Sequence, residues 1–126
     1  DFASTVSFID MARTTMKQLE QIAGRVKPAY NFIRLVGSRV DESKSMHREI
    51  LSMMRQVFGG SMATSVLKTS AEIDNASSRM KTVFELDRPV TSHEVHNRCM
   101  KHLSDVCREI ETDVLRTWAS RAGEAV

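Results

Sequence analysis

The stretch that decides the fold is residues 90–118, VTSHEVHNRCMKHLSDVCREIETDVLRTW. Thr91 and Glu94 have the spacing of a capping box, and Val90 and Val95 flank them as a hydrophobic staple does. No proline or glycine interrupts the chain before Gly123, so we predict one helix of roughly thirty residues, about 45 Å long, starting near Ser92. Its apolar stripe recurs every three or four positions: Val95, Cys99, Leu103, Val106, Ile110, Val114 and Trp118.

Outside this stretch, helix-stopping residues are few: Pro28, Gly59-Gly60 and Pro89 divide the chain into blocks of roughly thirty residues. Each block has apolar residues at helical spacing, which predicts an all-α fold, a compact antiparallel bundle of four to five helices with a long C-terminal helix. The predicted helices before the last one are a first from Phe2 to Lys27, a second from Pro28 through Ile33, Val36 and Val40, a third with Met46, Ile50, Met53 and Val57 on its core side, and a fourth from Val66 to about Leu86.

Length and composition favour a single helical domain over residues 1–126, which we interpret as a fragment of a longer chain because it begins at Asp1. Hydrophobic residues make up 41% and charged residues 27%, the balance of an ordinary globular protein. The apolar runs are too short for a membrane span, and the N-terminus has no signal-peptide pattern.

The two cysteines predict a reducing compartment. Cys99 and Cys107 lie in one predicted helix, roughly 12 Å apart along its axis, which is too far for a disulfide. Free thiols are typical of intracellular proteins, so we expect the cytoplasm or the nucleus.

One cluster has residue types that bind metals: His93, His96, Cys99 and His102 recur every third position. On one helix only neighbouring members can share a metal, so His96 and Cys99 form the strongest pair. A closed site would need ligands from elsewhere in the chain. A core cysteine flanked by exposed histidines explains the pattern more simply, so no metal and no cofactor is predicted.

Apolar residues that do not fit the core stripes indicate a partner-binding surface. The chain has eight methionines, and Met53-Met54 next to Val57-Phe58 cannot all face inward from one helix. Met54 and Phe58 are therefore predicted partner-binding residues, as is Trp118 at the end of the overlong last helix. Two copies could bury Trp118 in a homodimer. Alternatively, the first helix could cover this end within the same chain.

Basic residues gather in the first half of the chain. Although the net charge is only +2, residues 13–39 contain six cations against Glu20 alone. The pattern could be a solvated helix face or a surface that binds phosphate groups of nucleic acid or nucleoprotein. The candidate phosphate-binding residues are Arg13, Lys17, Arg25, Lys27, Arg34 and Arg39.

Motifs for catalysis are missing from the sequence. Gly59-Gly60 lacks the lysine and hydroxyl residue of a phosphate-binding loop, and no local motif marks a nucleophile. We therefore predict a non-enzymatic protein–protein interaction, assembly or regulatory module acting through exposed apolar helix surface. The alternative is nucleic-acid or nucleoprotein binding through the basic face in residues 13–39.

Overall fold

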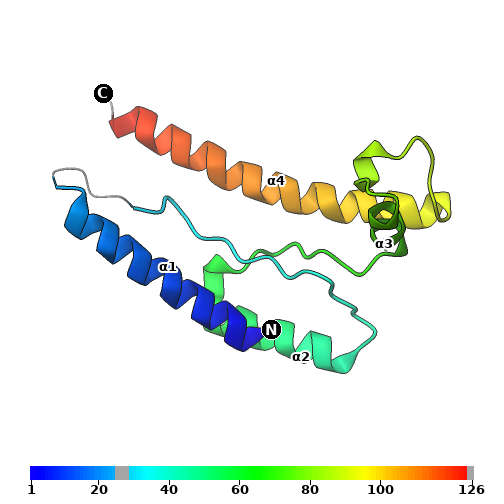
Figure 1. The fold of residues 1–126 in the computed structure, drawn as a ribbon, viewed down its shortest axis with the longest axis horizontal. Coiled ribbons are helices and arrows are strands. Elements are labelled where there is room, and N and C mark those ends of the chain that lie inside the picture. Colours follow the sequence, from blue (N-terminus) through cyan, green and yellow to red (C-terminus); the bar gives the residue numbers. More distant parts are fainter. Residues whose placement is uncertain (25–28, 125–126) are drawn as a thin grey trace. The chain divides into compact units, whose positions relative to one another are not determined.

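The computed structural model describes residues 1–24 and 29–124. In these residues there are four α-helices and no β-strand, so the predicted all-α class with a long C-terminal helix is confirmed (Figure 1). The chain separates into two compact units, Asp1–Ile33 and Arg34–Val126. The helices are α1 (Phe2–Ile22), α2 (Ser45–Phe58), α3 (Ala71–Ser78) and α4 (His93–Glu124), with short 3₁₀ turns η1 (Gly59–Ser61) and η2 (Val83–Glu85).

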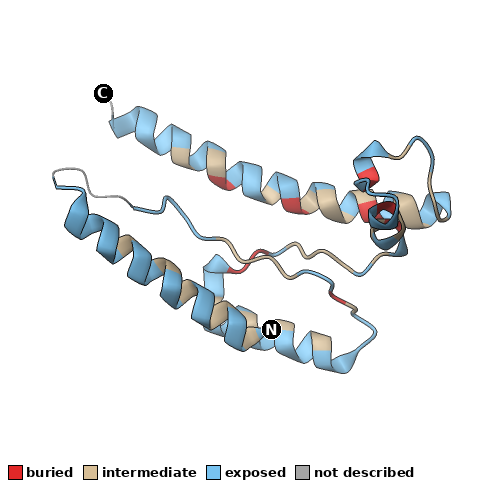
Figure 2. Ribbon diagram, in the orientation of Figure 1, coloured by how far each residue is buried: buried red, intermediate tan, exposed pale blue. Residues whose placement is uncertain are grey.

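The first unit consists mainly of α1. Asp1 caps this helix, because its carboxylate accepts the Ala3 N–H at 3.0 Å. The helix ends at Ile22, whereas the predicted stop at Lys27 lies outside the described residues. Most of α1 is exposed (Figure 2). Phe8 and Met11 are among its exposed residues. None of its residues is fully buried.

The predicted second helix is wrong in the part that the structure describes. Residues 29–44 contain no helix, and residues 35–40 run parallel to residues 62–68 through bridges that pair Leu35 with Met62 and Val40 with Lys68. The Leu35 N–H donates to the Ser61 carbonyl at 2.8 Å, and the Ala63 N–H donates to the Leu35 carbonyl at 2.7 Å. Spacing alone suggested a helix, but the β-branched residues here also suit extended backbone, and this pairing selects it.

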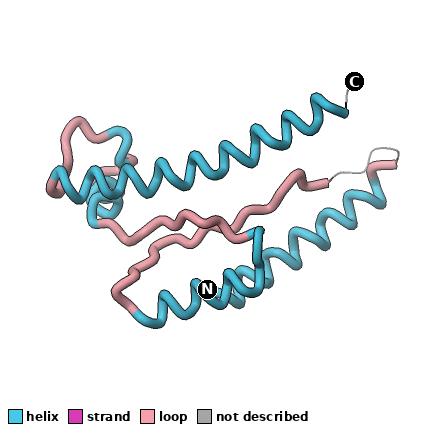
Figure 3. The backbone as a smooth tube through the Cα atoms, turned by 180° about the vertical axis from the view of Figure 1, so that it is seen from behind, coloured by secondary structure: helices cyan, strands magenta, loops and turns pink. Residues whose placement is uncertain are grey.

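Helix α2 is the crossover between these two parallel segments, which lie side by side between α2 and α4 in both Figure 1 and Figure 3. Parallel segments need such a long connection, since a tight turn can only join antiparallel ones. Gly59 ends the helix with a positive φ of 53°, as the sequence predicted for this glycine pair.

The structure contradicts the predicted orientation of α2. The four residues assigned to the core are exposed, and the neighbouring side of the helix is half-buried instead. Gly37 explains why the side of α2 with Leu51 packs inward, because a glycine leaves room for that side chain. A Cβ at position 37 would lie 3.2 Å from Leu51 Cδ1 and 3.2 Å from Val66 Cγ1. The exposed residues are Met46, Ile50, Met53 and Val57, and the half-buried ones are His47, Leu51, Met54 and Phe58.

The predicted fourth helix, Val66 to Leu86, is also wrong in extent. Only the eight residues of α3 are α-helical, and Met80 then has a φ of 55°. A capping box lies further on, where Thr82 and Glu85 bond each other's backbone at η2. Serine and threonine compete for backbone hydrogen bonds, and the segment around residue 70 is rich in them.

The predicted last helix is confirmed, with 32 residues from His93 to Glu124. Its predicted capping box is wrong: the Val95 N–H donates to Ser92 Oγ at 3.2 Å, and Glu94 pairs with Arg98. Helix α3 packs on α4 around a small core of Ala76, Val83 and Cys99. Within the described residues, no helix is both long and apolar enough to cross a membrane.

Candidate functional site

Carboxylates, rather than a large apolar core, attach the loops of the second unit to its helices. The buried Asp113 of α4 accepts two hydrogen bonds of 2.8 Å from Arg34. One turn earlier, Glu109 accepts the Thr64 and Ser65 N–H groups at 2.8 and 2.9 Å. The hydrogen bond from Arg34 lowers the pKa of Asp113. The hydrogen bond from the Ser65 backbone lowers the pKa of Glu109.

Glu72 of α3 binds the loop that precedes α4. Its side chain is fully buried and accepts the Val90 and Thr91 N–H groups at 2.8 and 2.9 Å, together with the Thr91 hydroxyl. His96 Nδ1 lies 3.0 Å from Oε1 of the same Glu72 carboxylate. Burial raises the pKa of Glu72, but the Thr91, Val90 and His96 hydrogen bonds outweigh it and hold the pKa at about 2.

The metal candidates are separated by this arrangement. His96 bonds Glu72, while Cys99 is buried in the apolar core beside Ala76 and Val83. In the part of the chain that the structure describes, no three histidine, cysteine or acidic side chains are grouped as metal ligands. Both cysteines are free thiols, Cys99 buried and Cys107 exposed.

The six predicted phosphate-binding residues do not form one described face. Arg13 and Lys17 are exposed on α1, in the first unit. Arg34 belongs to the second unit, where its ion pair with Asp113 occupies it, and Arg39 is exposed with a φ of 54°. The remaining two, Arg25 and Lys27, lie outside the described residues.

A different basic surface lies within the second unit. Two hollows of about 200 and 460 Å³ share Val40 and Glu42 in their walls. Arg48 and Arg55 of α2 line one of them, and Lys68, with Arg98 and His102 of α4, lines the other. We call these five residues the basic patch: Arg48, Arg55, Lys68, Arg98 and His102.

The charge around the two hollows is positive. Their walls carry four arginine or lysine side chains against the carboxylates of Asp41 and Glu42, and one of the four, Arg98, also pairs with the exposed Glu94 at 2.8 Å. Glu42 is neutralised by Lys68 at 2.9 Å. The pKa of His102 is lowered by burial first, and then by Lys68 and Lys101, which outrank the opposing Asp105 and Glu42. An anion placed here would therefore meet a favourable field.

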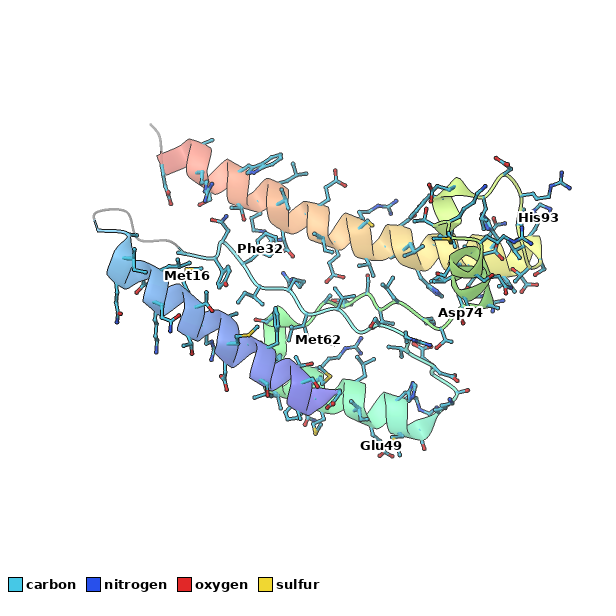
Figure 4. The ribbon with its side chains drawn as sticks, viewed as in Figure 1. Met16, Phe32, Glu49, Met62, Asp74 and His93 are labelled. Atoms are coloured by element: carbon cyan, nitrogen blue, oxygen red, sulfur yellow. The ribbon has the colours of Figure 1, made fainter. Side chains whose placement is uncertain are left out.

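The third feature is exposed apolar surface. Met46, Ile50, Met53 and Val57 follow one another at helical spacing along α2, and we call them the apolar edge. Figure 4 places the buried Met62 on the bridged segment and Glu49 on the far side of α2. Trp118 of α4 is 62% exposed, whereas the predicted partner residues Met54 and Phe58 are half-buried.

Sequence reasoning missed the basic patch. Arg48 and Arg55 are seven residues apart, which puts them on one side of a helix and could have been noticed. Lys68 and Arg98 gave no such signal, because they meet this surface only through the packing of the bridged segments and α4.

The chain resembles one curated protein in sequence. It is 24% identical over 119 residues to the "Putative replication protein A" of Rhizobium rhizogenes. The match covers 94% of this chain and 29% of that protein, so the chain spans less than a third of the relative's length. No protein-family model matches the chain.

Proposed function

We propose that the chain binds nucleic acid through the basic patch, as a non-catalytic part of a replication protein. The observation that carries the proposal is the convergence of cations from α2, α4 and the segment between them on two adjoining hollows. The name of the Rhizobium rhizogenes relative supports a role in replication. The proposal involves no chemical step.

Phosphates are the expected target of the basic patch. Among the residues that the structure describes, no phenylalanine, tyrosine or tryptophan lines either hollow, so stacking on bases has no support there. Arginine and lysine contacts to the backbone position a protein on nucleic acid without reading its sequence. We therefore infer binding with little sequence preference.

The test is DNA binding measured by fluorescence anisotropy over a series of salt concentrations. Each phosphate contact contributes about −0.9 to the slope of log affinity against log salt, so four contacts give a slope of about −3.6. Arg55→Ala and Arg98→Ala should each weaken binding and make the slope less steep by about one contact. A wild-type affinity that does not depend on salt would refute the proposal.

Two control variants locate the surface. Arg108→Ala removes an exposed α4 cation that lines neither hollow, and it should leave the slope unchanged. Arg13→Ala tests the basic face predicted from residues 13–39. If Arg13→Ala lost DNA binding and Arg55→Ala kept it, the binding surface would lie on α1 instead of at the basic patch.

A second candidate function is protein binding, favoured by the apolar edge. Exposed fractions of 67% at Met46 and 56% at Val57 leave an apolar surface that a partner helix or a second copy could bury. Trp118 offers a second anchor, as the homodimer hypothesis requires.

Site-specific photo-crosslinking in cells tests this second candidate. A crosslinker at Met53 should give a discrete protein adduct, while the same group at Ser52, which lies off the apolar edge, should not. Ile50→Asp should abolish the adduct without unfolding the chain. Equal labelling from both positions would contradict an interface on this edge.

A further inference from the structure

Helix α1 carries a strip of exposed apolar residues along one side. All four of its exposed large apolar side chains belong to this strip, with exposed fractions from 44% at Leu19 to 81% at Ile22. Each residue turns an α-helix by about 100°, so these side chains and the exposed Thr15 between them fall within roughly 80° of one another. We call this set the α1 strip: Phe8, Met11, Thr15, Leu19 and Ile22.

The spacing of the α1 strip is symmetric about its centre. Phe8 and Ile22 lie seven residues before and seven after Thr15. Met11 and Leu19 lie four residues before and four after it. A contact between two identical helices about a two-fold axis sets each position against the one equally far on the other side of the axis. Two antiparallel copies of α1 that cross at Thr15 would therefore set apolar side chain against apolar side chain along the whole strip.

The charged residues of α1 lie on the opposite side of the helix. They are about 140–160° round from Thr15, and the residues that border the strip are uncharged. Two copies can therefore approach through the strip without burying a charge. Because two anions balance the two cations, α1 has no net charge to attract it to an anionic lipid surface or to phosphate. The charged residues are Asp10, Arg13, Lys17 and Glu20.

We propose that the α1 strip binds the same strip of a second copy of this chain, so that two antiparallel α1 helices form a two-fold interface. One helix pair makes a small interface, so the dimer is reversible and its population rises with protein concentration. This interface belongs to the first unit, whereas the apolar edge and Trp118 belong to the second. The proposal does not depend on nucleic-acid binding.

Sedimentation velocity over a range of chain concentrations tests the proposal. The wild type should change from monomer to dimer as the concentration rises. Met11→Glu should raise the dissociation constant at least about tenfold, because it sets a charge against Leu19 of the other copy. Adding Leu19→Lys should bring the constant back towards the wild-type value, since opposite charges then meet at both ends of an antiparallel pair. A double variant no better than Met11→Glu, or a wild type that stays monomeric at every concentration, would overturn the proposal.

Disulfide trapping at the centre of the strip locates the contact. Cys107→Ser serves as the background, because it removes the exposed thiol. In this background, Thr15→Cys should give a disulfide-linked dimer under mild oxidation, since the two-fold axis brings the position next to its own copy. Thr14→Cys is the matched control, because Thr14 is also exposed but lies about 100° round the helix, and it should stay monomeric. Equal trapping at both positions would contradict the two-fold contact.

Two further variants show whether another surface makes the dimer. Trp118→Ala and Met53→Glu change exposed apolar residues of the second unit, and both should leave the dissociation constant unchanged. If either abolished the dimer while Met11→Glu did not, the interface would lie on α4 or α2 and the proposal would be wrong. A monomeric wild type that bound phosphatidylserine vesicles, and lost this binding in Met11→Glu, would assign the strip to a lipid surface instead.

Discussion

The Arg34 guanidinium and the Asp113 carboxylate, 79 positions apart in sequence, form a two-pronged ion pair with both N···O distances at 2.8 Å. Arg34 also donates to the Gly60 carbonyl in η1, the turn that follows α2. One side chain therefore joins the first bridged segment to η1 and to α4. The ion pair gives Arg34, one of the predicted phosphate-binding residues, a role in holding the second unit together.

Breaking one side of this pair should destabilise the chain more than replacing both sides. Arg34→Met leaves the buried Asp113 carboxylate with only the longer, 3.5 Å contact to Arg116, and Arg34→Met with Asp113→Leu removes both charges of the pair. We expect the urea midpoint of the single variant to fall below that of the double variant. Arg34→Met should also leave the salt slope of DNA binding unchanged; a less steep slope would show that Arg34 contacts phosphate.

Acid should weaken the attachment of the Val90–Thr91 loop through Glu72. The pKa of this group is lowered from 4.5 to about 2 in the folded chain, so the unfolded chain binds more protons between these values. Its contribution to stability is complete above pH 4.5 and is lost as the pH falls towards 2. Urea unfolding at a series of pH values should show this loss, and Glu72→Gln should make the profile flatter. An unchanged profile in Glu72→Gln would contradict the assignment.

Gly37 should tolerate a methyl group poorly. In Gly37→Ala the new Cβ meets Leu51 and Val66 side chains at 3.2 Å, and we expect a loss of about 1 kcal/mol in the free energy of unfolding. Gly60→Ala is the matched control, because no atom lies within 4 Å of its added Cβ. Equal stability of the two variants would indicate that the contact with α2 is looser than described.

Two adjacent methionines report which side of α2 packs. Met54→Ala should lower the free energy of unfolding by roughly 1–2 kcal/mol, because Met54 is half-buried. Met53→Ala should change it by less than about 0.5 kcal/mol, because Met53 is 41% exposed. Urea titration of the two variants measures these losses. A larger loss in Met53→Ala than in Met54→Ala would support the orientation of α2 that the apolar spacing predicted.

The parts of the fold that depend on local sequence could be predicted. Helix α4 follows from thirty residues without a helix breaker, and the end of α2 follows from Gly59 with its positive φ. The cap of α4 was missed by one residue. Thr91 has the right spacing, but its hydroxyl and N–H are bound by Glu72, nineteen positions earlier, and Ser92 caps the helix instead.

The parts that depend on distant partners could not be predicted. Val36 and Val40 fit a helical stripe equally well, and their extended form follows only from pairing with residues 62–68. The choice between the two apolar sides of α2 depends on Gly37, which the spacing within α2 does not reveal. The basic patch depends on the same packing, so the sequence indicated basic surface but located it in residues 13–39.

The pKa of His102 in the presence of DNA tests the central claim most directly. The imidazole lines the basic patch with Lys68 and Arg98, facing Asp41 and Glu42, and Lys101 and Asp105 flank it on α4. Proton NMR from about pH 5 to pH 8 follows its titration, with His102→Gln to assign the resonance. We predict that saturating DNA raises the pKa of His102, because a bound phosphate favours the imidazolium, and that Arg98→Ala reduces the rise. An unchanged His102 pKa at saturation would contradict nucleic-acid binding at the basic patch.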